Sequence, residues 1–173
     1  RDELFFGAIT GWLKRRFSWE VDPSVIEFSP GVVPNLGLAV QALTNPGEGV
    51  VIQPPVYPPF FGVVKDFGRK VVENPLLKTD TGYVMDFDHL DKVTSDVDTR
   101  LLLLSHPHNP VGRVWTEKEL IQLGQICLKN NVVIVSDEIH CDLTLFGHQH
   151  KPLASLSPEL AQITLTCMAP SKT

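Results

Sequence analysis

The chain has 173 residues, of which 43% are hydrophobic and 20% are charged, and its formal net charge is −5 at pH 7. This composition excludes an intrinsically disordered protein and allows one globular domain with a buried core. The negative charge argues against a nucleic acid or an anionic membrane as a partner. We also expect a cytoplasmic protein, because the sequence has neither an apolar run of roughly 18 residues nor a signal-peptide pattern, and its three separated cysteines are typical of reduced core thiols.

Helical and strand patterns alternate along the chain. The spacing of apolar residues predicts helices over residues 4–17, 35–43, 61–67, 86–92 and 116–130. Short apolar runs, most of them rich in β-branched residues or leucine, predict strands over residues 25–28, 50–53, 69–73, 101–104, 132–135 and 162–168. Such alternation predicts an α/β fold with three layers, in which helices cover both faces of a mostly parallel sheet.

The apolar run at 132–135 leads into the most conspicuous polar group of the sequence. It continues into Asp137, which is followed by Glu138 and then by His140. In open α/β sheets a ligand binds beyond the carboxyl ends of the strands. A carboxylate at that place is either a structural cap or the partner of a positively charged group, and the sequence around it leaves both readings open.

Other predicted strand ends and turns carry further candidate groups. Tyr57 lies in a proline-rich loop, where its ring could stack on a planar ligand or simply pack. Asn109 and Lys172 each follow a predicted strand. The turn at Gly31 precedes a helix, whose first N–H groups could bind an anion. An acid, an amide, an aromatic ring, an anion-binding helix end and a lysine together match the needs of a phosphorylated, planar, cationic aldehyde cofactor.

Five motifs in a fixed order span essentially the whole chain: Ser-Pro-Gly-Val-Val-Pro (29–34), Pro-Pro-Val-Tyr-Pro-Pro-Phe (54–60), Ser-His-Pro-His-Asn-Pro-Val-Gly-Arg-Val-Trp (105–115), Val-Ser-Asp-Glu-Ile-His (135–140) and Ala-Pro-Ser-Lys-Thr (169–173). Together they resemble the pyridoxal-phosphate enzymes of aminotransferase fold type I. More narrowly, they resemble the MalY/PatB-type cystathionine β-lyases, which cleave C–S bonds. His140 favours this lyase subgroup, because the broader aminotransferases usually carry tyrosine there.

The resemblance implies a role for each candidate side chain. Lys172 would bind pyridoxal phosphate covalently and then move the Cα proton of the substrate as general base and acid. Asp137 would pair with the pyridine nitrogen and keep it protonated. Asn109 would donate to the phenolic oxygen of the cofactor, Tyr57 would stack on its ring, and His140 would support Asp137.

The resemblance also implies a phosphate site, a reaction and a domain assignment. The backbone N–H groups of Val32 and Val33 would hold the phosphate. The reaction would be α,β-elimination of a small amino acid such as cystathionine, which gives a thiol, pyruvate and ammonia. Family members are longer and typically form homodimers. Residues 1–173 would therefore be an incomplete cofactor-binding large domain without the C-terminal small domain, and we expect this fragment to be catalytically weak or inactive.

Several alternatives remain open beside this reading. An aminotransferase of the same fold and a non-enzymatic regulatory or binding module would use the same pocket residues. The run Asp-Glu-Ile-His at 137–140 also matches the Asp-Glu-x-His box of nucleic-acid helicases, but the chain lacks their glycine-rich phosphate loop. The histidine pairs at 106/108 and 148/150 could bind zinc together with His140. We expect no metal, because the first pair flanks a proline in a turn and the second has the look of a solvated loop.

Overall fold

The computed structural model describes residues 2–172, and its centre is a five-stranded sheet whose neighbouring strands all run parallel. The strand order is β2-β1-β5-β6-β7. The strands are β1 (Gly49–Ile52), β2 (Lys70–Glu73), β5 (Thr99–Ser105), β6 (Val133–Asp137) and β7 (Thr164–Cys167). A separate antiparallel hairpin is formed by β3 (Leu77–Thr79) and β4 (Gly82–Val84).

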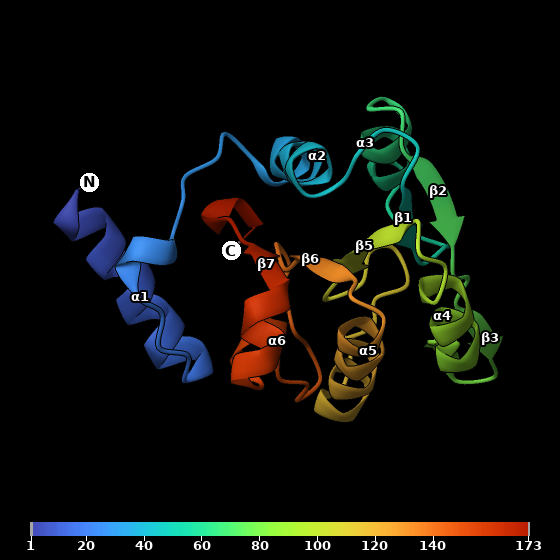
Figure 1. Ribbon diagram of the computed structural model, residues 1–173. Helices are drawn as coiled ribbons and strands as arrows, with labels where there is room; N and C mark the ends of the chain where they lie inside the picture. The colour runs from blue at the N-terminus through green and yellow to red at the C-terminus, as the bar shows by residue number, and fades with distance from the viewer. Residues whose placement is uncertain (1, 173) are drawn as a thin grey trace.

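Helices cover both faces of the sheet, which confirms the predicted three-layer α/β/α architecture (Figure 1). One face carries α2 (Val32–Leu43) and α3 (Pro59–Lys65). The opposite face carries α4 (Phe87–Thr94), α5 (Glu117–Lys129) and α6 (Pro158–Ile163). The 3-10 helices are η1 (Pro23–Val25), η2 (Leu153–Ser155) and η3 (Pro170–Lys172).

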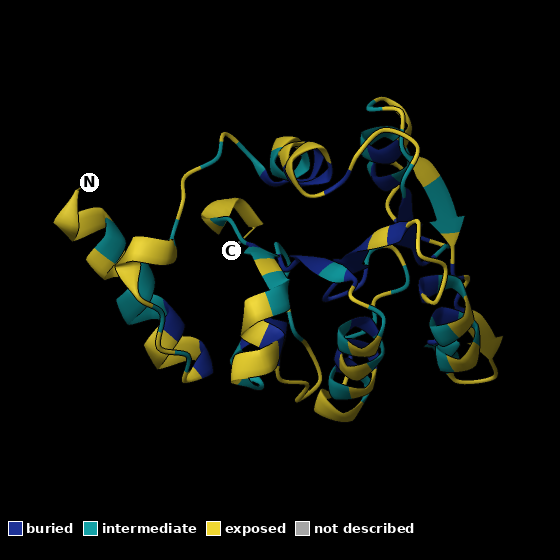
Figure 2. Ribbon diagram, viewed as in Figure 1, coloured by how far each residue is buried: buried dark blue, intermediate teal, exposed yellow. Residues whose placement is uncertain are grey.

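The central strands are buried on both faces, as Figure 2 shows for the dark blue segments between the helices. In β5 the alternation of side chains sends Leu101 and Leu103 into the core beneath α2 and α3, and Leu102 and Leu104 into the core beneath α4, α5 and α6. A continuous run of leucines is what a parallel strand covered on both faces requires.

Helix α1 (Glu3–Phe17) lies outside these two layers, at the end of the molecule nearest β7 (Figure 1). Its last turns pack Leu13 and Phe17 against Cys141, which follows β6. Arg16 donates to Asp142 at 3.0 Å and reinforces this contact. None of the helices within residues 2–172 is both long and apolar enough to cross a membrane.

The predicted strand at 25–28 is wrong. The chain forms η1 up to Val25 and no regular structure at residues 26–28, because the carboxylate of Asp22 accepts from the backbone N–H of Ser24 at 2.8 Å and Pro23 fixes the first helical position. Val25 and Phe28 are left exposed. The strand predicted at 162–168 is too long, because α6 reaches Ile163 before β7 begins. The hydroxyl of Ser157 caps this short helix, which the sequence patterns did not reveal.

Candidate functional site

Three neighbouring strands end at the same level of the sheet. Ser105, Asp137 and Cys167 are Cα partners in the registers of β5, β6 and β7. The loops that leave these three ends carry Asn109, His140 and Lys172, respectively. The sheet therefore gathers candidate groups from distant parts of the sequence at one carboxyl edge, which is where open α/β sheets bind ligands.

Asp137 is the buried acid of this edge, with 8% of its surface exposed. It shares the α2 face of β6 with Val135, because side chains alternate along a strand. Its Oδ1 atom accepts from the backbone N–H of Ile139 at 3.2 Å. The pKa of the Asp137 carboxyl is raised to about 6, mainly by burial and also by the negative charge of Glu138, while the hydrogen bond from Ile139 lowers it. A cation placed beside Asp137 would lower this pKa and favour the ionised form.

Backbone contacts bring the loops after β1 and β5 together. The hydroxyl of Ser105 accepts from the N–H of Asn109 at 3.0 Å, and the carbonyl of Asn109 accepts from the N–H of Tyr57 at 3.0 Å. Tyr57 lies just before α3, and 37% of its surface is exposed. The structure thus places Tyr57 beside Asn109 and connects both to the end of β5.

The first turn of α2 lies beside the end of β7. The amide of Asn35 contacts the Sγ atom of Cys167 at 3.1 Å, although Asn35 and Cys167 are far apart in the sequence. Gly31 precedes the helix in an extended conformation, and no side chain caps the helix. The first-turn N–H groups, which include those of Val32 and Val33, have no acceptor within the helix. They provide the donors and the partial positive charge that an anion requires.

Lys172 lies in η3, just past the end of β7, and its side chain is exposed. Burial lowers the pKa of His140, and the positive charge of Lys172 lowers it further. Because β6 and β7 are neighbouring parallel strands, His140, after β6, and Lys172, after β7, lie at the same edge of the sheet. The lowered pKa favours the neutral form of His140.

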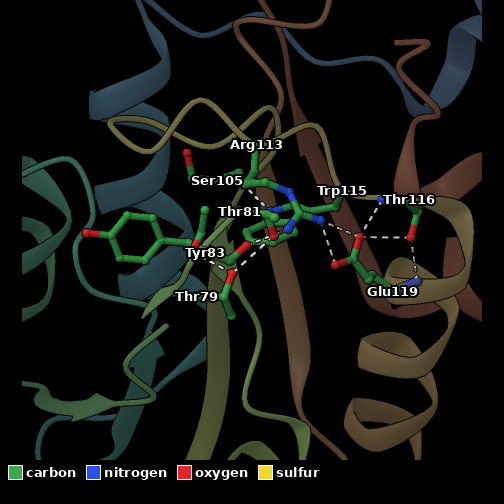
Figure 3. Close-up of polar contacts among 9 residues, drawn as sticks. Thr79, Thr81, Tyr83, Ser105, Arg113, Trp115, Thr116 and Glu119 are labelled. Atoms are coloured by element: carbon green, nitrogen blue, oxygen red, sulfur yellow. Dashed lines mark hydrogen bonds and ion pairs between the residues drawn. The ribbon is translucent and has the colours of Figure 1, made fainter. Parts of the chain in front are cut away.

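A second group of residues, centred on Arg113, holds the loop after β5 in place. Arg113 donates from Nη2 to both carboxylate oxygens of Glu119, at 2.7 and 2.9 Å, and from Nη1 to the carbonyl of Tyr83 (Figure 3). Its guanidinium group lies 4.7 Å from the ring of Trp115, whose Nε1 donates to the carbonyl of Ser105 at 3.0 Å. These contacts fix the loop that carries Asn109 to β4, to α5 and to the end of β5.

Sequence reasoning also missed the role of Glu138, whose side chain points to the other face of β6. The carboxyl group is fully buried, accepts from Ser136 Oγ at 2.8 Å and from the N–H of Leu153 at 3.1 Å, and forms a hydrogen bond of 2.7 Å with His150 Nε2. The ring of His106 stacks on that of His150, with centroids 4.3 Å apart. Strand alternation could have placed Glu138 opposite Asp137, but the sequence gives no signal that His150 is its partner.

The histidine pairs do not gather as a metal site. His148 is exposed as predicted, but the prediction of a solvated loop is wrong for His150, which is buried because it binds Glu138. Burial lowers the pKa values of His106 and His108 to about 4. Within the described part of the chain, no three His, Cys, Asp or Glu side chains are arranged to hold a metal ion.

The fold and this edge define an α/β protein whose ligand site lies at the carboxyl ends of parallel strands. The family model of aminotransferase class I and II matches residues 5–173, and the chain therefore belongs to this family. The resemblance inferred from the five motifs is confirmed at the level of the family and the fold.

Relatives with known names support a narrower grouping. The chain is 52% identical to "Cystathionine beta-lyase PatB" of Bacillus subtilis over 99% of this chain and 44% of that protein. It is 29% identical to "Protein MalY" of Escherichia coli over 91% of this chain and 40% of that protein. Cystalysin of Treponema denticola, whose crystal structure contains a pyridoxal 5'-phosphate cofactor, superposes with a TM-score of 0.97 at 42% identity. That superposition covers 99% of this chain and 43% of cystalysin. The chain thus spans less than half the length of each of these relatives.

Proposed function

We propose that this chain is the cofactor-binding large domain of a pyridoxal-phosphate-dependent C–S lyase. The complete protein would split cystathionine or a related cysteine-type amino acid into a thiol, pyruvate and ammonia. Residues 1–173 would form the large domain, and the small domain would lie beyond them. The observation that supports this proposal is the register of β5, β6 and β7, in which Ser105, Asp137 and Cys167 are Cα partners. This register brings Asp137 and the loops that carry Asn109 and Lys172 to one edge of the sheet.

The residues of this edge fit pyridoxal phosphate chemically. The carboxyl group of Asp137 is buried and lacks a partner of full positive charge among its hydrogen bonds within residues 2–172, and a protonated ring nitrogen would supply one. The first turn of α2 offers the N–H groups of Val32 and Val33 to a phosphate. When bound, the cofactor supplies an electron sink that stabilises negative charge on the Cα atom of an amino acid.

In this proposal the chain's own residues bind, orient and move protons. Asp137 would keep the ring nitrogen protonated, Asn109 would donate to the phenolic oxygen, and Tyr57 would stack on the ring. Lys172 would hold the cofactor through Nζ and would move the proton at the Cα atom of the substrate. His140 stays neutral beside Lys172, so that it supports Asp137 without opposing the positive charge of the lysine.

The reaction class can be tested on the complete protein loaded with pyridoxal phosphate. We expect pyruvate and a thiol to form from L-cystathionine when no keto acid is added. The family also contains aminotransferases, which is why an aminotransferase is the second candidate. Amino-group transfer that depends on an added keto acid, without any release of pyruvate from cystathionine alone, would replace the lyase with the aminotransferase.

We further infer that the complete protein is cytoplasmic and forms a homodimer. Cys127, Cys141 and Cys167 are all buried and free, which suits a reducing compartment. We propose the dimer because members of the family that the motifs resemble typically form homodimers. A mass of one subunit in size-exclusion chromatography with light scattering would overturn the dimer.

A further inference from the structure

Glu138 and His150 form a pair that is closed off from solvent on the face of β6 opposite Asp137. Their side chains are 0% and 1% exposed, and His150 Nε2 lies 2.7 Å from Glu138 Oε2. The second oxygen, Oε1, accepts from Ser136 Oγ and from the backbone N–H of Leu153. Both of these donors bind Oε1, so Oε2 is left to His150 alone, and an ion pair in which Nε2 donates to Oε2 would satisfy both oxygens of the carboxylate.

A carboxylate with no exposed atom requires a compensating positive charge, because burial removes its hydration. Of the three donors to Glu138, only His150 can carry such a charge. The neighbouring ring of His106 remains neutral, since burial lowers its pKa to about 4. On the other side of His150 lies the uncharged ring of Phe17, 5.3 Å away between centroids. On the geometry of the Nε2 contact we assign the positive charge to His150, whose second ring nitrogen, Nδ1, is buried and has no hydrogen-bond partner within residues 2–172.

The groups that face the two acids from other elements do not provide this charge. Burial raises the pKa values of Cys141, after β6, and Cys167, in β7, to about 12, so both thiols are neutral. On the α2 side, Asn35 contacts Cys167 and carries no charge.

The charged groups of α1 and α5 near this pair are bound to partners of opposite charge. Arg16 of α1 is bound to Asp142, and Glu119 of α5, whose charge acts on His106, is bound to Arg113. Lys151, which follows His150 in the chain, and Lys172, in η3 after β7, are both exposed.

We propose that His150 is a positioning residue for the proposed reaction, because it neutralises Glu138 and so keeps the adjacent carboxyl group of Asp137 ionised for its cationic partner. Without this compensation, two carboxylates that follow one another in the chain would both be buried, and like charges oppose each other's ionisation. The inference rests on the proposed function, in which Asp137 holds the ring nitrogen of the cofactor. It adds a residue on the far face of the sheet to the machinery of the site.

Amide substitutions separate the charge of this pair from its hydrogen bond. His150→Gln places an amide N–H near the position of Nε2, so it keeps the donor and removes the positive charge. Glu138→Gln keeps an acceptor oxygen and removes the negative charge. The double variant E138Q/H150Q removes both charges. The ionisation of Asp137 can be followed in cofactor-free protein by 13C NMR of labelled aspartate, with the signal assigned by its loss in D137N.

We expect H150Q to raise the titration midpoint of Asp137 by about one pH unit and E138Q to lower it by a similar amount. The double variant should return the midpoint to within a few tenths of a unit of the parent value. A purely structural role would lower the melting temperature of each variant and leave the Asp137 midpoint unchanged, and this result would overturn the proposal. If H150Q does not fold, E138Q alone decides, since a lowered midpoint supports the proposal and an unchanged midpoint overturns it.

A second measurement separates this inference from the proposed function. The pH below which added pyridoxal phosphate is no longer bound, followed by absorbance, should shift in the same directions in the same variants. If the parent protein binds no cofactor at any pH, the proposed function fails. The NMR midpoints then still show whether His150 compensates Glu138.

Discussion

Asp137 and Glu138 are adjacent acids at the end of one strand, yet they lie in opposite environments. Asp137 faces the α2 layer with a single backbone donor, Ile139, among the hydrogen bonds of the described residues. Glu138 faces the layer of α5 and α6 and accepts from two side chains and one backbone N–H. The difference shows that burial alone does not mark a binding residue. Asp137, which has no positively charged partner among these hydrogen bonds, is the candidate for binding a ligand. Glu138, whose carboxyl oxygens are both hydrogen-bonded, is part of the scaffold.

The largest effect in this comparison should come from truncating the scaffold acid. Glu138→Ala leaves His150, Ser136 and the N–H of Leu153 without their acceptor in the interior. We expect the free energy of unfolding to fall by about 3–5 kcal/mol, measured by urea denaturation at pH 7. Glu117→Ala, at an exposed position of α5, is the matched control and should change it by less than about 0.5 kcal/mol. Equal effects of the two substitutions would contradict the assignment of Glu138 to the scaffold.

For Asp137, the neighbouring acid, we expect a substitution to raise the free energy of unfolding. The pKa of Asp137 is about 6 in the folded chain and about 3.9 when unfolded, so the folded state binds its proton more tightly. The free energy of unfolding therefore falls as the pH rises from about 4 to about 6, and the penalty persists above that range. Asp137→Asn should stabilise the cofactor-free protein by about 2–3 kcal/mol at pH 7 and have no such effect at pH 4.

The same substitution should weaken binding of pyridoxal phosphate, because a neutral amide cannot replace the charged partner of a buried cation. We expect a loss of affinity of roughly 30-fold or more in a spectrophotometric titration. A variant D137N that is less stable than the parent at pH 7, or that binds the cofactor equally well, would show that Asp137 is a structural cap.

Removing the contacts that hold the loop after β5 should have an intermediate effect on the free energy of unfolding. Arg113→Met removes the bidentate contact with Glu119, the bond to the carbonyl of Tyr83 and the guanidinium group over the ring of Trp115, and it keeps an unbranched apolar side chain. We expect a loss of about 1.5–3 kcal/mol in the free energy of unfolding, with weaker cofactor binding.

The control for this experiment is Arg100→Met. Arg100 is half-exposed, and its Nε atom lies 3.7 Å from a carboxylate oxygen of Glu48. A surface pair of this kind contributes about 1 kcal/mol at most. If R113M is no more damaging than R100M, the loop does not depend on the contacts shown in Figure 3.

The smallest effect is expected at Tyr57, which is the most exposed of the residues that would contact the cofactor ring. Tyr57→Ala should weaken binding of pyridoxal phosphate by about 1 kcal/mol, because it removes one stacking face. Tyr57→Phe preserves that face and should bind within about twofold of the parent. Unchanged affinity in the alanine variant would return Tyr57 to the simple packing role that the sequence left open.

The parallel sheet could be predicted from the sequence because its strands are runs such as Leu101–Leu104, which have no polar residues to place on a solvated face. Helix α5 could be predicted from the spacing of its apolar residues, and its start is fixed by two local hydrogen bonds between Thr116 and Glu119. Such signals are local. The turn at Asp22 and Pro23 and the cap at Ser157 are local too, but they compete with strand-like runs and were not recognised.

The site could be predicted in part. Asp137, Asn109 and Lys172 each lie at or after the end of a strand. Because these strands run parallel, their carboxyl ends lie at one edge of the sheet. The pairing of Glu138 with His150 and of Asn35 with Cys167 joins residues whose proximity only the packed fold creates, and the pattern of residue types did not indicate them.

In the proposed function, the carboxyl edge between β5 and β7 binds pyridoxal phosphate through Lys172. Adding the cofactor to the complete protein and recording the visible absorption spectrum tests this binding. We predict a new visible band in the parent and in Lys118→Ala, whose side chain is exposed on α5, and no such band in Lys172→Ala. A band that persists in the Lys172 variant, or that is missing from the parent, would contradict the claim.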